Sequence, residues 1–287
     1  MSIIGVDVGG TNIKAGVLQD TFEVCCRLDK PTPPTAGGIV NTIQEIVAEL
    51  WRHVPGAPVG ISFAGTWDNQ GRVTANQLGL KNAPVKQMLQ DVFGMDIPVE
   101  NDAVCALIAE HRYGALKDCQ VGILLTLGTG IGGGVMVHGQ PLRGYQGVHG
   151  ELGHMITHLD GRLCSCGQKG CWEQYAAARV LGQMAAPLTT KELADQVRNG
   201  LQSDVWQQYI HEVVGGIQSL LMVFMPEVIV IGGGLSGAGN ILVGSIQQEL
   251  EQTSAFQTYC PFTRVVPASF RNDAGIIGAA ALAEEKP

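Results

Sequence analysis

The sequence of 287 residues has no apolar run near the roughly 18 residues that cross a bilayer, so we expect no membrane-spanning helix. It also lacks an excess of positive charge: 18 Lys and Arg stand against 26 Asp and Glu, a formal net charge of −8. Such a chain has no general attraction for nucleic acid or an anionic membrane, and we expect neither as a partner. A bound polyanion must instead be held locally, by backbone N–H groups or a metal ion.

The first residues, MSIIGVDVGG, lack the basic segment of a secretory signal peptide and reach an acidic residue at Asp7. Without such a signal, we expect the eight cysteines to be reduced thiols of a cytoplasmic protein, some of them bound to metal. Charged residues make up only 15% of the chain and hydrophobic residues 45%, which is typical of a compact enzyme. The length allows one large domain or two medium ones.

Three of the cysteines are close together: Cys164, Cys166 and Cys171 fall within eight residues, and His154 lies ten residues before the first. Three thiolates and one imidazole are a complete tetrahedral ligand set for structural zinc. The alternatives are three buried thiols in a loop, or a disulfide, which Cys-x-Cys neighbours rarely have the geometry to form. We expect one zinc ion here, and interior packing for the other five cysteines.

Two segments repeat one plan, in which a Gly/Thr-rich turn joins two apolar strands. Strands 2–8 and 13–18 flank the turn 9–12, and strands 121–127 and 135–138 flank the turn 128–134. Glycine permits positive φ and lets backbone N–H groups approach an anion. Two such turns predict a duplicated phosphate clamp. Asp7, at the end of the first strand, is a candidate to hold a magnesium-bound water.

Other candidate residues follow strands or lie in loops. Glu100-Asn101-Asp102-Ala103 lies where a strand meets the predicted helix 103–113, and ligands of open α/β sheets gather at such strand ends. Asp102 is there either a helix cap or a general base, and position alone does not separate the two. A glycine triplet, 232–234, follows the buried strand 228–231 and predicts either close approach of a nucleoside or a plain tight turn. Asn76, in an Asn-rich loop, is either solvated or a ligand for sugar hydroxyls.

Together these segments resemble the ROK family of sugar kinases, whose α/β fold is the two-domain actin-like ATPase fold with a zinc-binding loop. The matching segments are DVGGTNIK (7–14), ENDA (100–103), LGTGIGGG (127–134), GELGH (150–154), CSCGQKGCWE (164–173) and VIVIGGG (228–234). They span nearly the whole chain. The Glu-x-Gly-His element together with Cys-x-Cys-Gly-x-x-Gly-Cys is the most specific of them.

The resemblance implies a role for each matching residue, with Asp102 as catalytic base and ATP, Mg²⁺ and structural Zn²⁺ as cofactors. The residues expected to hold zinc are His154, Cys164, Cys166 and Cys171. Those expected to bind the sugar are Gly65, Asn76, Asn101, Asp102, Glu151, His154 and Glu173. Those expected to bind ATP are Asp7, Gly9, Gly10, Thr11, Asn12, Lys14, Gly128, Thr129, Gly130, Gly132, Gly133, Gly232, Gly233 and Gly234.

The chain departs from the family pattern in two places near the expected sugar site. Val104 stands where many members have Asn, and Phe63-Ala64-Gly65 stands where they have Val-Pro-Gly. Both departures bear on which sugar is used rather than on the chemistry. The resemblance predicts phosphorylation of the 6-hydroxyl of a hexose, and glucose is the first choice because it is the frequent substrate in the family. The alternative substrate is an N-acetylhexosamine, particularly N-acetylmannosamine. A sugar-sensing regulator without activity is the alternative of another class, and Asp102 and the two turns argue against it.

The resemblance also predicts the organisation of the chain. We expect one domain over 1–115, to which a C-terminal helix at 274–287 returns, and a second over 116–273 that contains the zinc loop. A homodimer is the expected assembly.

Overall fold

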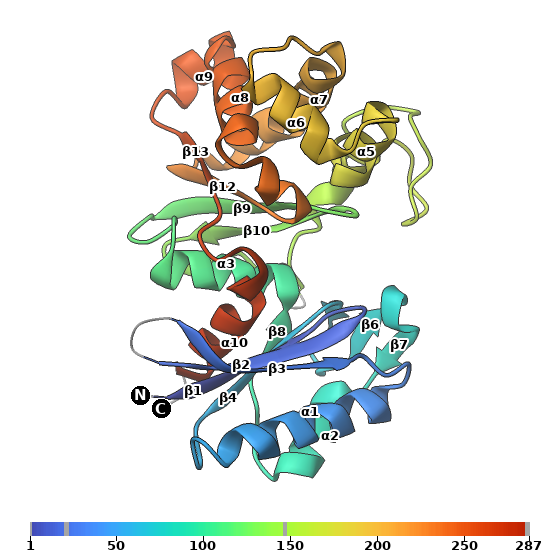
Figure 1. Ribbon diagram of the computed structural model, residues 1–287, viewed down its shortest axis with the longest axis vertical. Coiled ribbons are helices and arrows are strands. Elements are labelled where there is room, and N and C mark those ends of the chain that lie inside the picture. Colours follow the sequence, from blue (N-terminus) through green and yellow to red (C-terminus); the bar gives the residue numbers. More distant parts are fainter. Residues whose placement is uncertain (1, 20–22, 146–147, 285–287) are drawn as a thin grey trace. The chain divides into compact units, whose positions relative to one another are not determined.

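The computed structural model describes residues 2–19, 23–145 and 148–284 (Figure 1). Contacts within the chain divide it into two units. Unit 1 comprises Met1–Gly114, Pro141–Gly150 and Asn272–Pro287, and unit 2 comprises Ala115–Gln140 and Glu151–Arg271. The expected domains remain a prediction; the segment 141–150, which the sequence assigns to the second domain, groups with unit 1.

Unit 1 is built on a five-stranded sheet of order β3-β2-β1-β4-β8. Its strands are β1 (Ile3–Val8), β2 (Asn12–Leu18), β3 (Val24–Pro31), β4 (Val59–Phe63) and β8 (Val99–Asn101). Its helices are α1 (Ala36–Trp51), α2 (Val85–Phe93), α3 (Asp102–Tyr113) and α10 (Ala274–Glu284). A small second sheet contains β5 (Thr66–Trp67), β6 (Val73–Ala75) and β7 (Leu80–Ala83). Figure 1 shows α1 and α2 on one side of the large sheet and α3 and α10 on the other.

Helix α10 packs very closely on β1 and β4. A Cβ atom on Gly5 or Gly60 would collide with the backbone carbonyl groups of Ile276 and Ala279, so only glycine permits this approach. Every contact of α10 with these strands and with α3 lies within unit 1. Helix α10 is therefore part of the layer that supports β1 and β8, where Asp7 and Asn101 lie.

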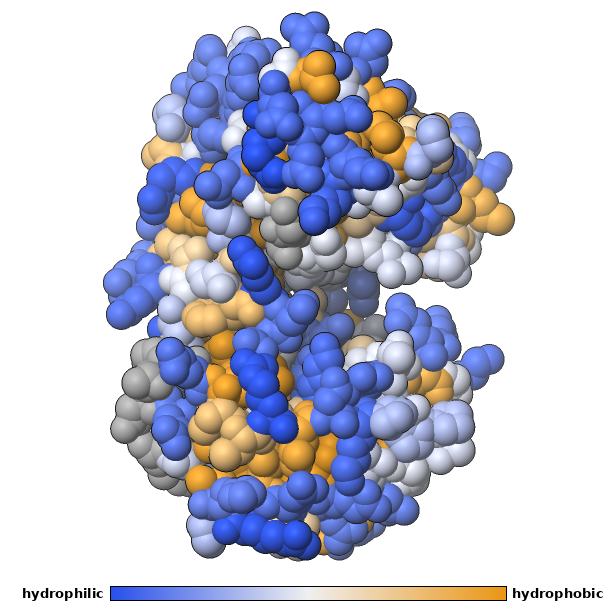
Figure 2. Space-filling model, viewed as in Figure 1, coloured by the Kyte–Doolittle hydropathy of each residue, from blue (hydrophilic) through white to orange (hydrophobic). Residues whose placement is uncertain are grey.

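Unit 2 has a sheet of order β11-β10-β9-β12-β13. Its strands are β9 (Val121–Leu127), β10 (Ile131–Val137), β11 (Gln140–Pro141), β12 (Val228–Gly232) and β13 (Arg264–Pro267). Its helices are α4 (Glu173–Ala176), α5 (Ala178–Ala185), α6 (Thr190–Arg198), α7 (Asp204–Phe224), α8 (Gly239–Glu251) and α9 (Ser254–Tyr259). Each unit has its own apolar core, and the surfaces in view carry mostly hydrophilic residues (Figure 2).

The two sheets share one pairing pattern, which confirms the repeated hairpins. The expected turn 128–134 is too long, however, because β10 begins at Ile131 and the glycines 132–134 lie in the strand. In unit 1, β1 pairs antiparallel with β2 and parallel with β4, and β4 pairs parallel with β8. In unit 2, β9 pairs antiparallel with β10 and parallel with β12, and β12 pairs parallel with β13. The two Gly/Thr turns therefore hold equivalent places, each at the end of a central strand.

The helices α4 and α5 are separated at Ala177, whose ψ of 153° is extended. The break starts a new helix just before Arg179. Among the five cysteines outside the candidate metal cluster, Cys26 is exposed rather than packed, and Cys25 is only partly buried. Among the described residues, the structure contains no helix with the length and apolar character of a membrane span.

Candidate active site

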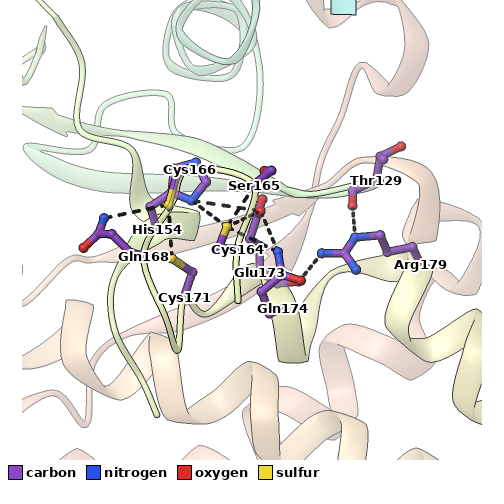
Figure 3. Close-up of polar contacts among 10 residues, drawn as sticks. All are labelled: Thr129, His154, Cys164, Ser165, Cys166, Gln168, Cys171, Glu173, Gln174 and Arg179. Carbon is purple, nitrogen blue, oxygen red and sulfur yellow. Dashed lines mark hydrogen bonds and ion pairs between the residues drawn. The ribbon is translucent and has the colours of Figure 1, made fainter. Parts of the chain in front are cut away.

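The candidate metal ligands of unit 2 lie together. The ligand atoms of His154, Cys164, Cys166 and Cys171 all lie within 4.8 Å of one another. Cys164 Sγ is 3.6 Å from His154 Nδ1, and Cys166 Sγ is 3.5 Å from Cys171 Sγ (Figure 3). Tetrahedral zinc with Zn–S bonds of about 2.3 Å separates its ligand atoms by about 3.5–3.8 Å. The four side chains therefore fit a structural zinc ion that reaches His154 through Nδ1.

The surroundings of the three thiols differ. Burial, with the neighbouring thiols adding to it, raises the pKa of Cys171 to about 12 in the absence of a cation. The backbone N–H of Gln168 is the main cause that lowers the pKa of the Cys166 thiol, which favours the thiolate form that binds metal. Gln174 Nε2 donates to Cys164 Sγ at 3.3 Å. Such contacts orient a ligand set and stabilise its charge.

Glu173, the first residue of α4, connects this cluster to the second Gly/Thr turn. Its Oε1 lies 3.2 Å from Cys164 Sγ and accepts a hydrogen bond from Gln174 Nε2 at 3.1 Å. Its Oε2 lies 2.5 Å from the place where a Cβ atom on Gly130 would be. Any side chain at position 130 would therefore displace the Glu173 carboxylate, which the family resemblance assigns to the sugar.

Two further segments pack on the strands that flank this turn. The segment Glu151–His154 ends in the short 3-10 helix η2 (Leu152–His154), and Gly153 lies so close to the Ile131 carbonyl group that a Cβ atom there would collide. A Cβ atom on Gly233 would lie 2.5 Å from the Leu127 carbonyl oxygen, and its φ of 89° also favours glycine. The sugar-binding candidates Glu151 and His154 and the glycine triplet are thus both anchored beside the second turn.

In unit 1 the first turn is closed by several hydrogen bonds. Gly9 N donates to Asn12 O at 3.0 Å. Thr32 donates twice to the turn, from Oγ1 to Gly9 O and from N to Thr11 O, both at 2.8 Å. Asn12 Nδ2 donates to Asp29 Oδ1 at 2.6 Å, so part of the amide expected to meet ATP is already used.

Near the same turn lie Asn76 and Gln77, which begin the 3-10 helix η1 (Asn76–Leu78) and are both exposed. A Cβ atom on Gly10 would lie 3.1 Å from Gln77 Oε1. The side chain of Gln77, which sequence patterns do not single out, therefore borders the first turn.

Asp7 lies at the end of β1 and accepts a hydrogen bond from Ser62 Oγ at 2.6 Å. Burial raises its pKa from 3.8 to about 6, the Ser62 hydrogen bond opposes this shift, and the nearby charge of Asp102 adds to it. Gly275, at the start of α10, leaves no room for a Cβ atom against this carboxylate. A divalent cation would relieve both the burial of the charge and its repulsion from Asp102, so Asp7 fits a role beside Mg²⁺.

We expect Asp7→Asn to stabilise the ligand-free protein at pH 8. Because the folded-state pKa is raised, ionisation costs free energy as the pH rises from about 4 to about 6, and the cost stays above that range. Removing the ionisable carboxyl should raise the free energy of unfolding by up to about 3 kcal/mol at pH 8 and by little near pH 4. Urea unfolding at the two pH values measures the difference. An equal effect at both would contradict the raised pKa, and magnesium-dependent turnover should be lost.

Asn101 and Asp102 have different tasks at the start of α3. Asn101 is the helix cap: its Oδ1 accepts from Ala103 N at 2.9 Å and from Val104 N at 3.2 Å. Its Nδ2 donates to Gly65 O at 2.9 Å, so one amide hydrogen remains for a sugar hydroxyl. Asp102 is exposed, and its Oδ1 accepts from Ala103 N at 3.0 Å. The capping role that the sequence left open for Asp102 therefore belongs mainly to Asn101.

The residue before them, Glu100, is buried and ties this strand end to the segment 141–150. Its carboxylate lies 2.7 Å from Arg143 Nη2 and 3.3 Å from His149 Nε2, and it accepts from Asn101 N at 2.8 Å. Burial would raise the pKa of Glu100, but these three contacts, led by His149, hold it below its ordinary value. The carboxylate is therefore ionised and supports the peptide that carries Asn101.

The ROK family model matches residues 3–286. The chain belongs to the ROK family. It is 33% identical over 311 residues to a glucokinase of Streptomyces coelicolor, with 98% of this chain and 97% of that protein covered. An N-acetylmannosamine kinase of Escherichia coli is 28% identical over 292 residues, with 97% of each chain covered.

A solved structure covers this ROK protein completely. The ROK family glucokinase from Streptomyces griseus, in complex with glucose and AMPPNP, is 32% identical and superimposes with a TM-score of 0.84 over 100% of both chains. The similarity confirms the actin-like ATPase fold expected from the sequence.

The predicted binding residues of this ROK protein are distributed over both units. Unit 1 holds Asp7, Gly9, Gly10, Thr11, Asn12, Lys14, Gly65, Asn76, Asn101 and Asp102. Unit 2 holds the zinc ligands with Glu151, Glu173, Gly128, Thr129, Gly130, Gly132, Gly133, Gly232, Gly233 and Gly234. Their roles toward ATP and sugar remain predictions.

Several residues that contact this set carry no signal in the sequence alone. Ser62, Thr32, Gln77 and Arg179 are separated in sequence from the motifs they contact or lie in ordinary helical and loop segments. Only Glu100 had a usable signal, because it directly precedes Asn101-Asp102.

Proposed function

We propose that this ROK protein is an ATP- and magnesium-dependent kinase that transfers phosphate to the 6-hydroxyl of glucose. The observation that carries the proposal is the arrangement at the start of α3. Asn101 caps the helix with two backbone hydrogen bonds, and the carboxylate of Asp102 beside it is exposed, as a general base must be to meet a substrate. Full-length similarity to glucokinases supports the choice of ATP and glucose.

The proposed phosphoryl transfer needs no covalent intermediate on the protein. A sugar hydroxyl is a weak nucleophile, and Asp102 takes its proton as the oxygen attacks the γ-phosphoryl group. Positioning and charge neutralisation provide the rest. The two turns offer backbone N–H groups to the phosphates, Asp7 would hold Mg²⁺ through water, and the glycine triplet admits the adenosine. Magnesium neutralises the developing phosphate charge when it is bound.

Zinc would act structurally, because four protein ligands leave no open position on the ion. With Nδ1 of His154 on the metal, the tautomer is fixed and Nε2 is left for a sugar hydroxyl. Glu151 and Glu173 would accept from the other hydroxyls. A homodimer in the cytoplasm completes the proposal.

A panel of sugars in an ADP-release assay tests the substrate. We expect the highest kcat/KM for glucose and no ADP release with 6-deoxyglucose, a control that lacks only the acceptor hydroxyl. The similarity to an N-acetylmannosamine kinase makes that sugar the second candidate. A higher kcat/KM for N-acetylmannosamine than for glucose would make N-acetylmannosamine the proposed substrate. Binding of a sugar without ADP release from any member of the panel would instead favour a regulator.

A further inference from the structure

The second Gly/Thr turn has open backbone donors. Gly128 N donates to Gly130 O at 3.0 Å and closes the turn. Within the part of the chain that the structure describes, the N–H groups of Thr129 and Gly130 donate to no acceptor. Two open N–H groups bind an anion well only when their directions are held, because a turn rich in glycine otherwise loses the most conformational entropy on ordering.

Arg179, in the first turn of α5, makes contacts that hold these directions. Its backbone N donates to Gly128 O at 3.4 Å. Its Nε donates to Thr129 O at 2.7 Å, as Figure 3 shows. In a planar trans peptide the carbonyl and the following N–H point in opposite directions. Arg179 therefore turns both carbonyls toward itself and both N–H groups, those of Thr129 and Gly130, away from α5.

The same side chain reaches the cluster that fits zinc. Arg179 Nη2 donates to the backbone carbonyl of Glu173 at 3.4 Å, two residues after Cys171. One guanidinium group thus joins the phosphate turn to the start of α4. The flat, forked shape of the group suits this double contact, which a lysine ammonium on a flexible stem reproduces poorly.

We propose that Arg179 is a positioning residue for ATP: it aims the N–H groups of Thr129 and Gly130 at the phosphates and ties them to the zinc loop. The inference rests on the proposed kinase function. Arg179 acts through the turn, so its loss weakens nucleotide binding rather than proton transfer.

The first turn, in unit 1, supports this inference independently. There Thr32 donates to Gly9 O and Thr11 O, and it thereby fixes the direction of the Gly10 N–H in the same manner. Both turns of the repeat thus have an external donor on their carbonyl groups, although the two donors are unrelated in sequence and in chemistry. In both turns, therefore, a donor from outside the hairpin fixes the direction of the peptides that would face a phosphate.

A matched control lies beside Arg179. This control is Arg162, which lines the same cavity of about 360 Å³ as Arg179. The other lining residues are Gln174, Val180, Gln183 and Met184. Arg162 Nη1 donates to Gln174 O at 2.8 Å, and its guanidinium lies 4.7 Å from the Tyr175 ring centre. Among the described residues, the Arg162 guanidinium contacts Gln174 and Tyr175 rather than the turn. Replacing either arginine removes the same charge from the same cavity, but only Arg179 controls the turn.

The experiment compares Arg179→Met and Arg162→Met with the wild type. In Arg179→Met, the AMPPNP affinity measured by calorimetry should fall about 10- to 100-fold, and the KM for ATP should rise by a similar factor. This is the effect expected from losing charge-assisted hydrogen bonds. The KM for sugar should change less than about threefold, and Arg162→Met should keep its AMPPNP affinity. Zinc content, measured in all three proteins, should stay at one per chain.

Chemical rescue by added guanidinium provides a second measurement, because a side chain that only stabilised the fold would not be replaced by the free cation. Arg179→Ala should regain part of its AMPPNP affinity in millimolar guanidinium, which the neighbouring cavity has room to admit, whereas Arg179→Lys should remain weak. Unchanged AMPPNP affinity in a folded Arg179→Met, or equal losses in both Met variants, would overturn the inference. A wild type that binds no AMPPNP would overturn the kinase function itself.

Discussion

Asp102→Asn is expected to lower kcat by about 10²–10⁴-fold, the usual contribution of a general base, in a protein that remains fully folded. Asparagine keeps the size of the side chain and can still accept the hydrogen bond from Ala103 N. It cannot take a proton from the sugar hydroxyl. Sugar affinity should change much less, because Glu151, His154 and Glu173 are expected to hold the other hydroxyls.

The comparison variant for this prediction is Asn101→Ala, which should also weaken sugar binding because Asn101 is an expected sugar ligand. Asn101 accepts from two backbone N–H groups of α3 and holds Gly65 O, so its removal should cost about 1 kcal/mol or somewhat more of unfolding free energy. The two neighbours should therefore separate catalysis from capping. For both variants, kcat, the melting temperature and the sugar affinity should be measured, since these separate the loss of turnover from the loss of stability. A folded Asp102→Asn protein that retains more than about a tenth of wild-type kcat would falsify the base assignment.

Loss of zinc is the second large effect that we expect. Cys166 is exposed, so Cys166→Ala removes a ligand without leaving a cavity in the core. Structural zinc contributes folding free energy directly, and a missing ligand should lower metal affinity by at least about 10- to 100-fold. Elemental analysis should show less than one zinc per chain, and the melting temperature should fall.

Sugar affinity should fall together with the metal content, because the ligand His154 and the neighbouring Glu173 belong to the expected sugar site. Cys260→Ala is the control, since Cys260 is a buried thiol of unit 2 outside the cluster. It should lose a little stability through a small cavity and retain zinc and sugar affinity. Carefully purified wild type without zinc, or a Cys166→Ala protein with unchanged metal content, would refute the ligand set.

The sequence by itself determined the features that depend on short spacing. Cys164, Cys166 and Cys171 lie within one loop, and no long-range folding is needed to bring them together; His154 joins them through a turn of the same segment. The two Gly/Thr turns are likewise hairpins, whose register follows from adjacent strands. Local chemistry and periodicity are sufficient for such elements.

The tertiary structure alone decided which side chains hold these elements in place. Asn101 rather than Asp102 caps α3, Glu100 meets Arg143 and His149 over 40 residues away, and Arg179 meets Thr129 across a similar separation. Arginine, threonine and asparagine are common on any helix or loop, so composition does not mark these partners. Their hydrogen bonds form only after sheets and helices have packed, because a donor and an acceptor distant in sequence must first be brought within about 3 Å.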